Sequence, residues 1–161
     1  MVTLPQSPNL DAQRAAMKRL AFLVGKWTGE ARIHRGPGEP VILAQSEHAQ
    51  YKLDGLLLLI EGIGRDKTDG APVLQALGII SYDDAAGAYR MRAFNDGRFL
   101  ETVVKLSGDG LSLTWGFALE DIKTSSVLRI NDKGEWTEHH EIAVGSQPPR
   151  TLMELSVARV E

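Results

Sequence analysis

The sequence predicts an all-β protein: a closed, antiparallel up-and-down barrel of about ten strands, preceded by one N-terminal α-helix. Three observations carry this prediction. Beyond Gly25 no apolar pattern of helical length returns, and short β-rich runs take its place. Turn sequences such as Asp54-Gly55 and Asn95-Asp96-Gly97 separate these runs roughly every 12 residues, which is typical of an antiparallel meander. An open meander of this length has two edge strands with unpaired backbone N–H and C=O groups, and closure into a barrel pairs these two edges with each other.

The composition is that of a globular protein and excludes several classes of function. The 161 residues are 43% apolar and 24% charged, which indicates a single domain spanning residues 1–161. The formal net charge of −3 gives no electrostatic reason to bind nucleic acid or an anionic membrane. The chain has no cysteine, hence no disulfide framework and no thiol nucleophile. The first ten residues do not resemble a signal peptide, and the densest apolar run, 56–60, is too short for membrane insertion. We therefore expect a cytoplasmic location.

The N-terminal part predicts a tail and then a helix. Residues 1–9 are polar, contain two prolines and are expected to form a flexible tail. Asn9 is a suitable N-cap for a helix over residues 10–24, and Asp11 in its first turn favours the positive end of the helix dipole. Gly25 is expected to end this helix as a C′ glycine, and the barrel is expected to occupy residues 26–160.

The predicted strands alternate between one buried and one solvated face. In the seventh strand Leu113, Trp115 and Phe117 share a side, and in the ninth Trp136, Glu138 and His140 do so. The predicted strand ranges are 26–34, 41–53, 56–66, 72–82, 88–95, 98–106, 111–118, 122–131, 135–144 and 151–160.

Two stretches of the chain carry a resemblance to a known family. The first is Leu20 to Glu30, which fits the pattern Leu-x-x-Leu-x-Gly-x-Trp-x-Gly-Glu, and the second runs from Leu77 through Tyr82-Asp83 to Gly97. Both are similar to the calycin-type, lipocalin-like barrels, in particular the nitrobindin-like proteins and the bacterial DUF1579 proteins of unknown function. The resemblance implies a ten-stranded barrel with a helix near one mouth and an interior able to hold a small apolar molecule.

The resemblance also bears on cofactors and on one tryptophan. Nitrobindins hold haem through a histidine at the start of the last strand, where this chain has Arg150 to Leu155 and no histidine. We therefore expect no cofactor, although Met153 is a residue type that can ligate haem iron. Calycins place the tryptophan that corresponds to Trp27 at the closed end, under a basic residue of the last strand. Arg159 is the residue at that position here, and the resemblance favours a structural role for this pair.

Other candidate groups give weak chemical signals. His139 and His140 are adjacent on a strand and point to opposite faces, so they cannot coordinate the same metal ion. No metal site is therefore predicted. His140 is the best single candidate for a polar contact to a ligand if its side chain points inward. Arg90 and Arg92 are expected to face solvent, but a register slip of one residue would turn them inward as an anion site. No nucleophile motif or phosphate loop is present, and no catalytic residue is predicted.

These features predict non-covalent binding of a small hydrophobic molecule inside the barrel, because closed barrels of more than about eight strands generally leave internal space. The residues expected to line the site are Trp27, Tyr51, Leu57, Leu77, Ile79, Met91, Val103, Trp115, Phe117, Leu128, Trp136 and His140. Two alternatives remain open. One is a haem-binding protein or isomerase of the nitrobindin kind, and the other is a structural protein with a filled core that associates with itself, for example as a homodimer.

Overall fold

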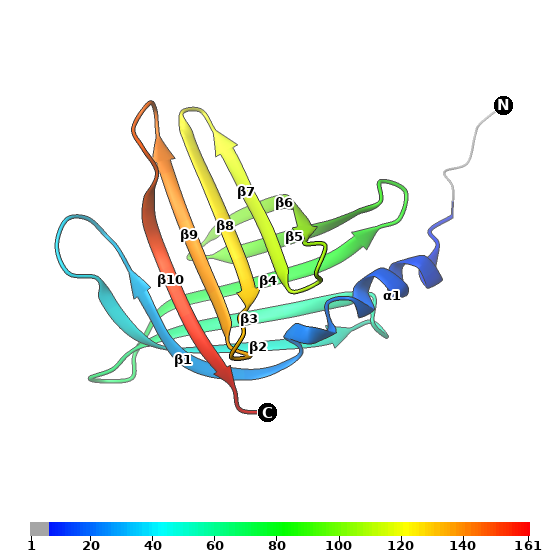
Figure 1. The fold of residues 1–161 in the computed structure, drawn as a ribbon, viewed down its shortest axis with the longest axis horizontal. Coiled ribbons are helices and arrows are strands. Elements are labelled where there is room, and N and C mark those ends of the chain that lie inside the picture. The colour runs from blue at the N-terminus through cyan, green and yellow to red at the C-terminus, as the bar shows by residue number, and fades with distance from the viewer. Residues whose placement is uncertain (1–6) are drawn as a thin grey trace.

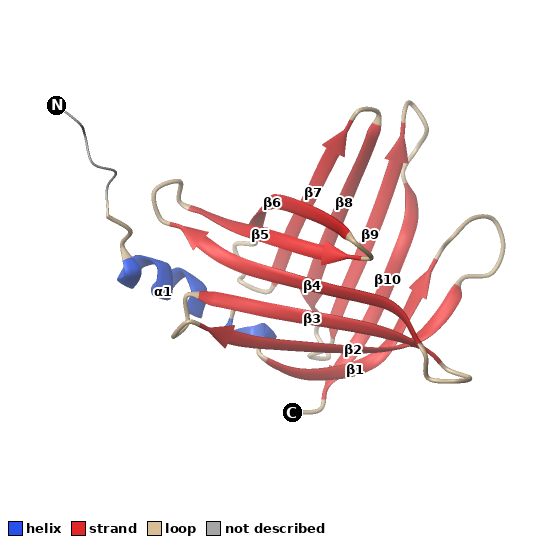
Figure 2. Cartoon of the chain, turned by 180° about the vertical axis from the view of Figure 1, so that it is seen from behind, coloured by secondary structure: helices blue, strands red, loops and turns tan. Residues whose placement is uncertain are grey.

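The computed structural model describes residues 7–161 and contains a closed barrel of ten antiparallel strands with one α-helix at the N-terminal end (Figures 1 and 2). Each strand pairs with the next along the chain, and the first pairs with the last, so the predicted up-and-down barrel is confirmed. The predicted tail lies partly outside the described residues, which begin at residue 7. The strands are β1 Gly25–Ile33, β2 Val41–Lys52, β3 Leu57–Asp66, β4 Pro72–Asp83, β5 Ala88–Asn95, β6 Arg98–Leu106, β7 Ser112–Leu119, β8 Ile122–Ile130, β9 Trp136–Val144 and β10 Arg150–Arg159.

The helix is shorter than the sequence predicts. Helix α1 spans Leu10–Lys18, and a separate 3₁₀ turn, η1, spans Ala21–Leu23. The predicted N-cap is present, because the backbone N–H of Ala12 donates to the side-chain oxygen of Asn9 over 3.0 Å. Side chains three residues apart eclipse in a 3₁₀ turn, so η1 brings Leu20 and Leu23 onto one face, where both are fully buried. The predicted helix over residues 10–24 is therefore wrong in its second half, where the chain forms a 3₁₀ turn that packs against the barrel.

Helix α1 closes one mouth of the barrel. Figure 1 shows it beside the turns that join β2 to β3 and β4 to β5. The Tyr51 hydroxyl donates to the carbonyl of Met17 over 2.6 Å, and the Tyr89 hydroxyl donates to that of Ala16 over 2.7 Å. Each carbonyl also accepts a backbone N–H, that of Ala16 from Arg19 and that of Met17 from Leu20, so the tyrosines add a second hydrogen bond that ties the last helical turn to the barrel. Burial raises the pKa of both tyrosines, so the hydroxyls stay protonated and keep donating across neutral pH.

The two ends of the barrel interior differ in how well their side chains are covered. The side chains at the helix end are completely covered and form the hydrophobic core; they include Met17, Leu20, Leu23, Trp27, Leu58, Ile80, Leu113, Leu128 and Trp136. At the opposite mouth, inward-facing apolar side chains remain exposed. Because the helix fills one end, any space for a ligand lies toward the helix-free mouth.

Candidate site inside the barrel

The register decides which of the predicted lining residues face inward. Cross-strand partners in an antiparallel sheet share a face, and this parity can be followed around all ten strands. Eight of the predicted residues lie on the inner face: Trp27, Tyr51, Met91, Trp115, Phe117, Leu128, Trp136 and His140.

Four predicted residues lie on the outer face and are removed from the interior lining: Leu57, Leu77, Ile79 and Val103. Their inward neighbours in sequence are Leu58, Ile80 and Val104, all of which are buried. In these strands apolar side chains occupy both faces, so alternation along the sequence gives no unique register. Arg90 and Arg92 face outward as predicted.

The closed end is built around Trp27, as the sequence predicts. The guanidinium carbon of Arg159 lies 4.2 Å from the centroid of the Trp27 ring, a cation–π geometry. The indole N–H donates to the carbonyl of Leu23 over 2.9 Å, and the ring meets that of Trp136 edge-on with centroids 5.5 Å apart. Arg159 also donates to the carbonyl of Phe22 over 2.9 Å. Trp27 therefore joins the chain before β1 to the end of β10 and faces the interior at the helix end.

A chain of hydrogen bonds runs along the inner face of β8 and β9. Ser126 and His140 are cross-strand partners, and the serine Oγ lies 2.7 Å from Nδ1 of the imidazole. The other ring nitrogen, Nε2, lies 2.8 Å from Oε2 of Glu138, and Oε1 of Glu138 accepts from the indole N–H of Trp136 over 2.9 Å. The ring of Trp115 meets the imidazole edge-on with centroids 5.9 Å apart. This network, called the β8–β9 network below, consists of Ser126, Trp136, Glu138 and His140.

The β8–β9 network is enclosed but still reached by solvent. The side chains of His140 and Glu138 keep 17% and 11% of their surface exposed, and Ser126 is 6% exposed. Residues on the inner face that are nearer the helix-free mouth, such as Thr124 and Ile142, are half-buried. Solvent therefore reaches the network from the helix-free mouth.

A second polar pair, Gln45 and Glu47, lies on the inner face of β2. The Gln45 amide nitrogen donates to Oε1 of Glu47 over 2.7 Å, and both side chains are buried. Two glycines of β3 make room for this pair. A Cβ at Gly62 would lie 2.8 Å from the Glu47 carboxyl oxygens, and a Cβ at Gly64 would lie 2.8 Å from the amide oxygen of Gln45. Glycine inside a strand marks such a close approach of a neighbouring group.

Burial favours the neutral form of Glu47. Desolvation raises the pKa of Glu47 well above its ordinary value, the nearby charge of Glu138 raises it further, and the hydrogen bond from Gln45 only partly opposes this. Glu138 receives two N–H donors, whereas Glu47 receives one. The neutral form is therefore favoured at Glu47. Within the described residues the amide oxygen of Gln45 has no hydrogen-bond partner.

Uncovered apolar side chains form a rim above the β8–β9 network. Phe117, Leu119 and Val144 lie on inward-facing positions of β7 and β9 and are 40%, 65% and 40% exposed. Leu119 pairs with Ile122, which in turn pairs with Val144, so these side chains form a continuous row around part of the mouth. This group of Phe117, Leu119, Ile122 and Val144 is called the apolar rim below.

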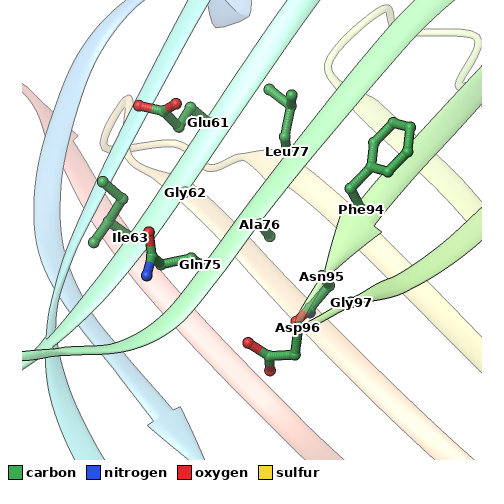
Figure 3. Close-up of a pocket in the computed structure, with 10 residues that line it drawn as sticks. All are labelled: Glu61, Gly62, Ile63, Gln75, Ala76, Leu77, Phe94, Asn95, Asp96 and Gly97. Atoms are coloured by element: carbon green, nitrogen blue, oxygen red, sulfur yellow. The ribbon is translucent and has the colours of Figure 1, made fainter.

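Two surface hollows lie on the outer face of the barrel. The first, of about 270 Å³, lies over β3, β4 and the β5–β6 turn (Figure 3). Figure 3 shows Leu77 and Phe94 beside it, both outward-facing, with Asn95 to Gly97 at one end. The second, of about 300 Å³, lies beside Arg32 and Glu154. Neither hollow brings together more than scattered polar groups, in contrast to the connected network inside.

His139 lies on the outer face of the barrel. Its Nε2 is 3.1 Å from Oε1 of Glu141, and its Nδ1 is 3.3 Å from Oε1 of Glu154. Within residues 7–161 no group of three or more histidine and acidic side chains is arranged to hold a metal ion. No helix in the same described range is long and apolar enough to cross a membrane.

The sequence identified His140 and Glu138 but missed Ser126. Glu138 was placed on the same face of β9, whereas Ser126 is joined to His140 only by the β8–β9 register, which sequence does not give. For Glu47 a signal did exist: Gly62 and Gly64, two residues apart within a strand, indicate a neighbouring side chain that needs their space.

Comparison with known proteins supports the fold. The chain is similar to the crystal structure of Rv2717c from M. tuberculosis, with a TM-score of 0.66 over 91% of this chain and 98% of that one. The two sequences are 13% identical, so the similarity extends to the barrel and carries no function. No protein-family model matches the chain, and no curated protein matches it.

Proposed function

We propose that the barrel binds a small, mainly apolar molecule through its helix-free mouth, with the apolar rim around the ligand body. The observation that carries the proposal is the exposure of Phe117, Leu119 and Val144 on inward-facing positions directly above a connected polar network. A contiguous exposed apolar surface is costly in water, and a pocket that combines it with a few convergent polar groups is typical of a ligand site.

The polar groups indicate what the inner end of the ligand carries. Glu138 and His140 are the network side chains that solvent reaches, and Glu138 lies close enough to Glu47 to raise the pKa of the Glu47 carboxyl. A ligand with one hydrogen-bonding group at the end of an apolar body complements this arrangement, because a fully apolar end would leave these groups without water. Burial of the apolar body contributes roughly 25 cal/mol per Å² before the cost of ordering the ligand.

The donor set inside the barrel does not fit haem. His140 is the inward-facing histidine of β9, and both of its ring nitrogens are engaged, one by Ser126 and one by Glu138. An imidazole ligand to iron needs one free nitrogen. Met153 faces inward beside His140, but a lone thioether is a poor haem site. We therefore propose a ligand other than haem and no resident cofactor.

The experiment measures uptake of an apolar reporter dye whose fluorescence rises on leaving water. Val144→Asp places a charge on the apolar rim and is expected to weaken dye binding at least 10-fold. Val127→Asp is the matched control, because Val127 is comparably exposed but faces outward on the neighbouring strand, and it is expected to leave binding unchanged. Equal dye binding by both variants and the parent protein would place the dye elsewhere and refute the proposed site.

We also propose a family and a cellular location for the protein, and self-association is the alternative to ligand binding. The barrel supports membership of the nitrobindin-like and DUF1579 group, and the absence of cysteine is compatible with the cytoplasm. Self-association is the competing use of the apolar rim, because two copies could cover each other's exposed side chains. Sizing chromatography separates the two: a dimer that Val144→Asp dissociates, together with no dye uptake, favours the interaction protein.

A further inference from the structure

We propose that Ser126, His140 and Glu138 form a nucleophilic triad that takes up acyl groups from small apolar esters seated inside the barrel. The inference rests on the proposed function, because the ester must enter by the same mouth and lie against the same apolar rim. It adds a reaction class and a nucleophile that the binding proposal does not contain.

The direction of each hydrogen bond follows from the chemistry of the groups. A carboxylate only accepts hydrogen bonds, so the imidazole nitrogen that faces Glu138, Nε2, carries the hydrogen. In a neutral imidazole the other nitrogen, Nδ1, is then an acceptor, and the Ser126 hydroxyl donates to it over 2.7 Å. This is the arrangement of a serine nucleophile, a histidine base and an orienting carboxylate, with the two ring nitrogens exchanged relative to the usual order.

The three side chains are held by rigid elements. Ser126 and His140 are cross-strand partners, and Glu138 lies two residues from His140 on the same face of β9. The indole N–H of Trp136 occupies the second oxygen of Glu138, which fixes the carboxylate plane. On the outer face of the same two strands, His139 contacts two carboxylates and no hydroxyl. The combination of a hydroxyl, an imidazole and a carboxylate is therefore particular to the inner face.

The reaction step can be written in full. The Ser126 oxygen attacks the ester carbonyl carbon while its proton passes to Nδ1 of His140, and the carbonyl π pair moves onto the carbonyl oxygen. The resulting imidazolium is stabilised by Glu138. The carbonyl re-forms, the bond from carbon to the leaving alkoxide breaks, and the alkoxide takes the proton from Nδ1. The products are an alcohol and an acyl-serine, which water hydrolyses through the same base to regenerate the serine and release an acid.

The barrel wall also predicts that turnover is slow. Backbone N–H groups in a strand lie in the plane of the sheet, so they do not point at a carbonyl oxygen inside the barrel. Stabilisation of the oxyanion is therefore left to side-chain donors, and a missing oxyanion-hole donor typically costs 10²–10³ in rate. We therefore expect acylation of one serine per chain followed by slow release of the acid.

The experiment follows p-nitrophenyl butyrate with the full chain and measures both nitrophenol release and intact mass. A burst of one equivalent and a mass increase of one butyryl group on the peptide that contains Ser126 are expected. Ser126→Ala should abolish the burst and the adduct, and His140→Gln should slow the burst at least 100-fold. The matched controls, Ser125→Ala and His139→Gln, change the adjacent outward-facing residues and should leave the burst unchanged.

The outcomes separate this inference from the proposed function. Dye uptake that is competed by the butyrate ester, with no adduct or with an adduct on another residue, overturns the triad and leaves ligand binding in place. Absence of both dye uptake and adduct overturns both proposals. If His140→Gln unfolds, as judged by tryptophan fluorescence, Ser126→Cys serves instead: a thiol in place of the hydroxyl should restore the adduct that Ser126→Ala loses.

Discussion

Replacement of Glu47 by glutamine should remove a pH-dependent loss of stability. The Glu47 carboxyl is buried on the inner face of β2, and its pKa is raised well above the ordinary value near 4.5. The folded protein therefore holds a proton that the unfolded chain releases above that pH. With the folded pKa above the unfolded one, the stabilisation is fully present below about pH 4.5 and is lost as the pH rises toward the folded pKa.

The size of the effect follows from one linked proton. The free energy of unfolding of the parent protein should fall by up to about 1.4 kcal/mol for each pH unit within this window. Glu47→Gln keeps the volume of the side chain and an oxygen that can accept from Gln45, and it removes the titratable proton. Within this window the variant should therefore gain up to about 1.4 kcal/mol per pH unit relative to the parent.

The assay is urea unfolding followed by tryptophan fluorescence at half-unit steps from pH 4.5 to pH 8. Glu61→Gln is the matched control, because Glu61 is exposed on the outer face of the neighbouring strand, and it should follow the parent curve. Parallel curves for Glu47→Gln and the parent over the whole range would refute the reasoning, since they would mean that Glu47 titrates alike in the folded and unfolded chains.

Three further predictions concern the barrel frame. Gly29→Ala should destabilise by about 1–3 kcal/mol or more, because the added Cβ overlaps the backbone of β10, whereas Gly108→Ala meets nothing and should be neutral; thermal unfolding by circular dichroism compares them. Arg159→Ala should cost about 1 kcal/mol by removing the cation–π contact with Trp27, lowering Tm by a few degrees, and Arg159→Lys should recover part of the loss. Tyr89→Phe should cost about 1 kcal/mol and speed hydrogen exchange in the last turn of α1 while leaving the strands protected; equal acceleration throughout would contradict a local role.

The sequence was sufficient for the barrel because its information is local. Turn residues with positive φ, such as Asp96 and Gly97, mark where strands must reverse, and they do so whatever the partner strand is. The interval between turns sets strand length, and the number of strands with short connections leaves little choice but an up-and-down barrel. Helix α1 was predicted too long because Leu20 and Leu23 pack into the barrel end, a contact that local pattern does not contain.

The sequence by itself therefore determined the strand count, the turn positions, the cap at Asn9, and the inward side of β7, where large apolar residues alternate with small or polar ones. Only the tertiary structure decided which face Leu77 and Ile79 occupy, because both faces of β4 are apolar and a slip of one residue is invisible in the sequence. It alone also joined Ser126 to His140 and buried Glu47 beside Glu138. Register and barrel closure bring together residues that are far apart in the chain, and the chemistry of the interior depends on the contacts between them.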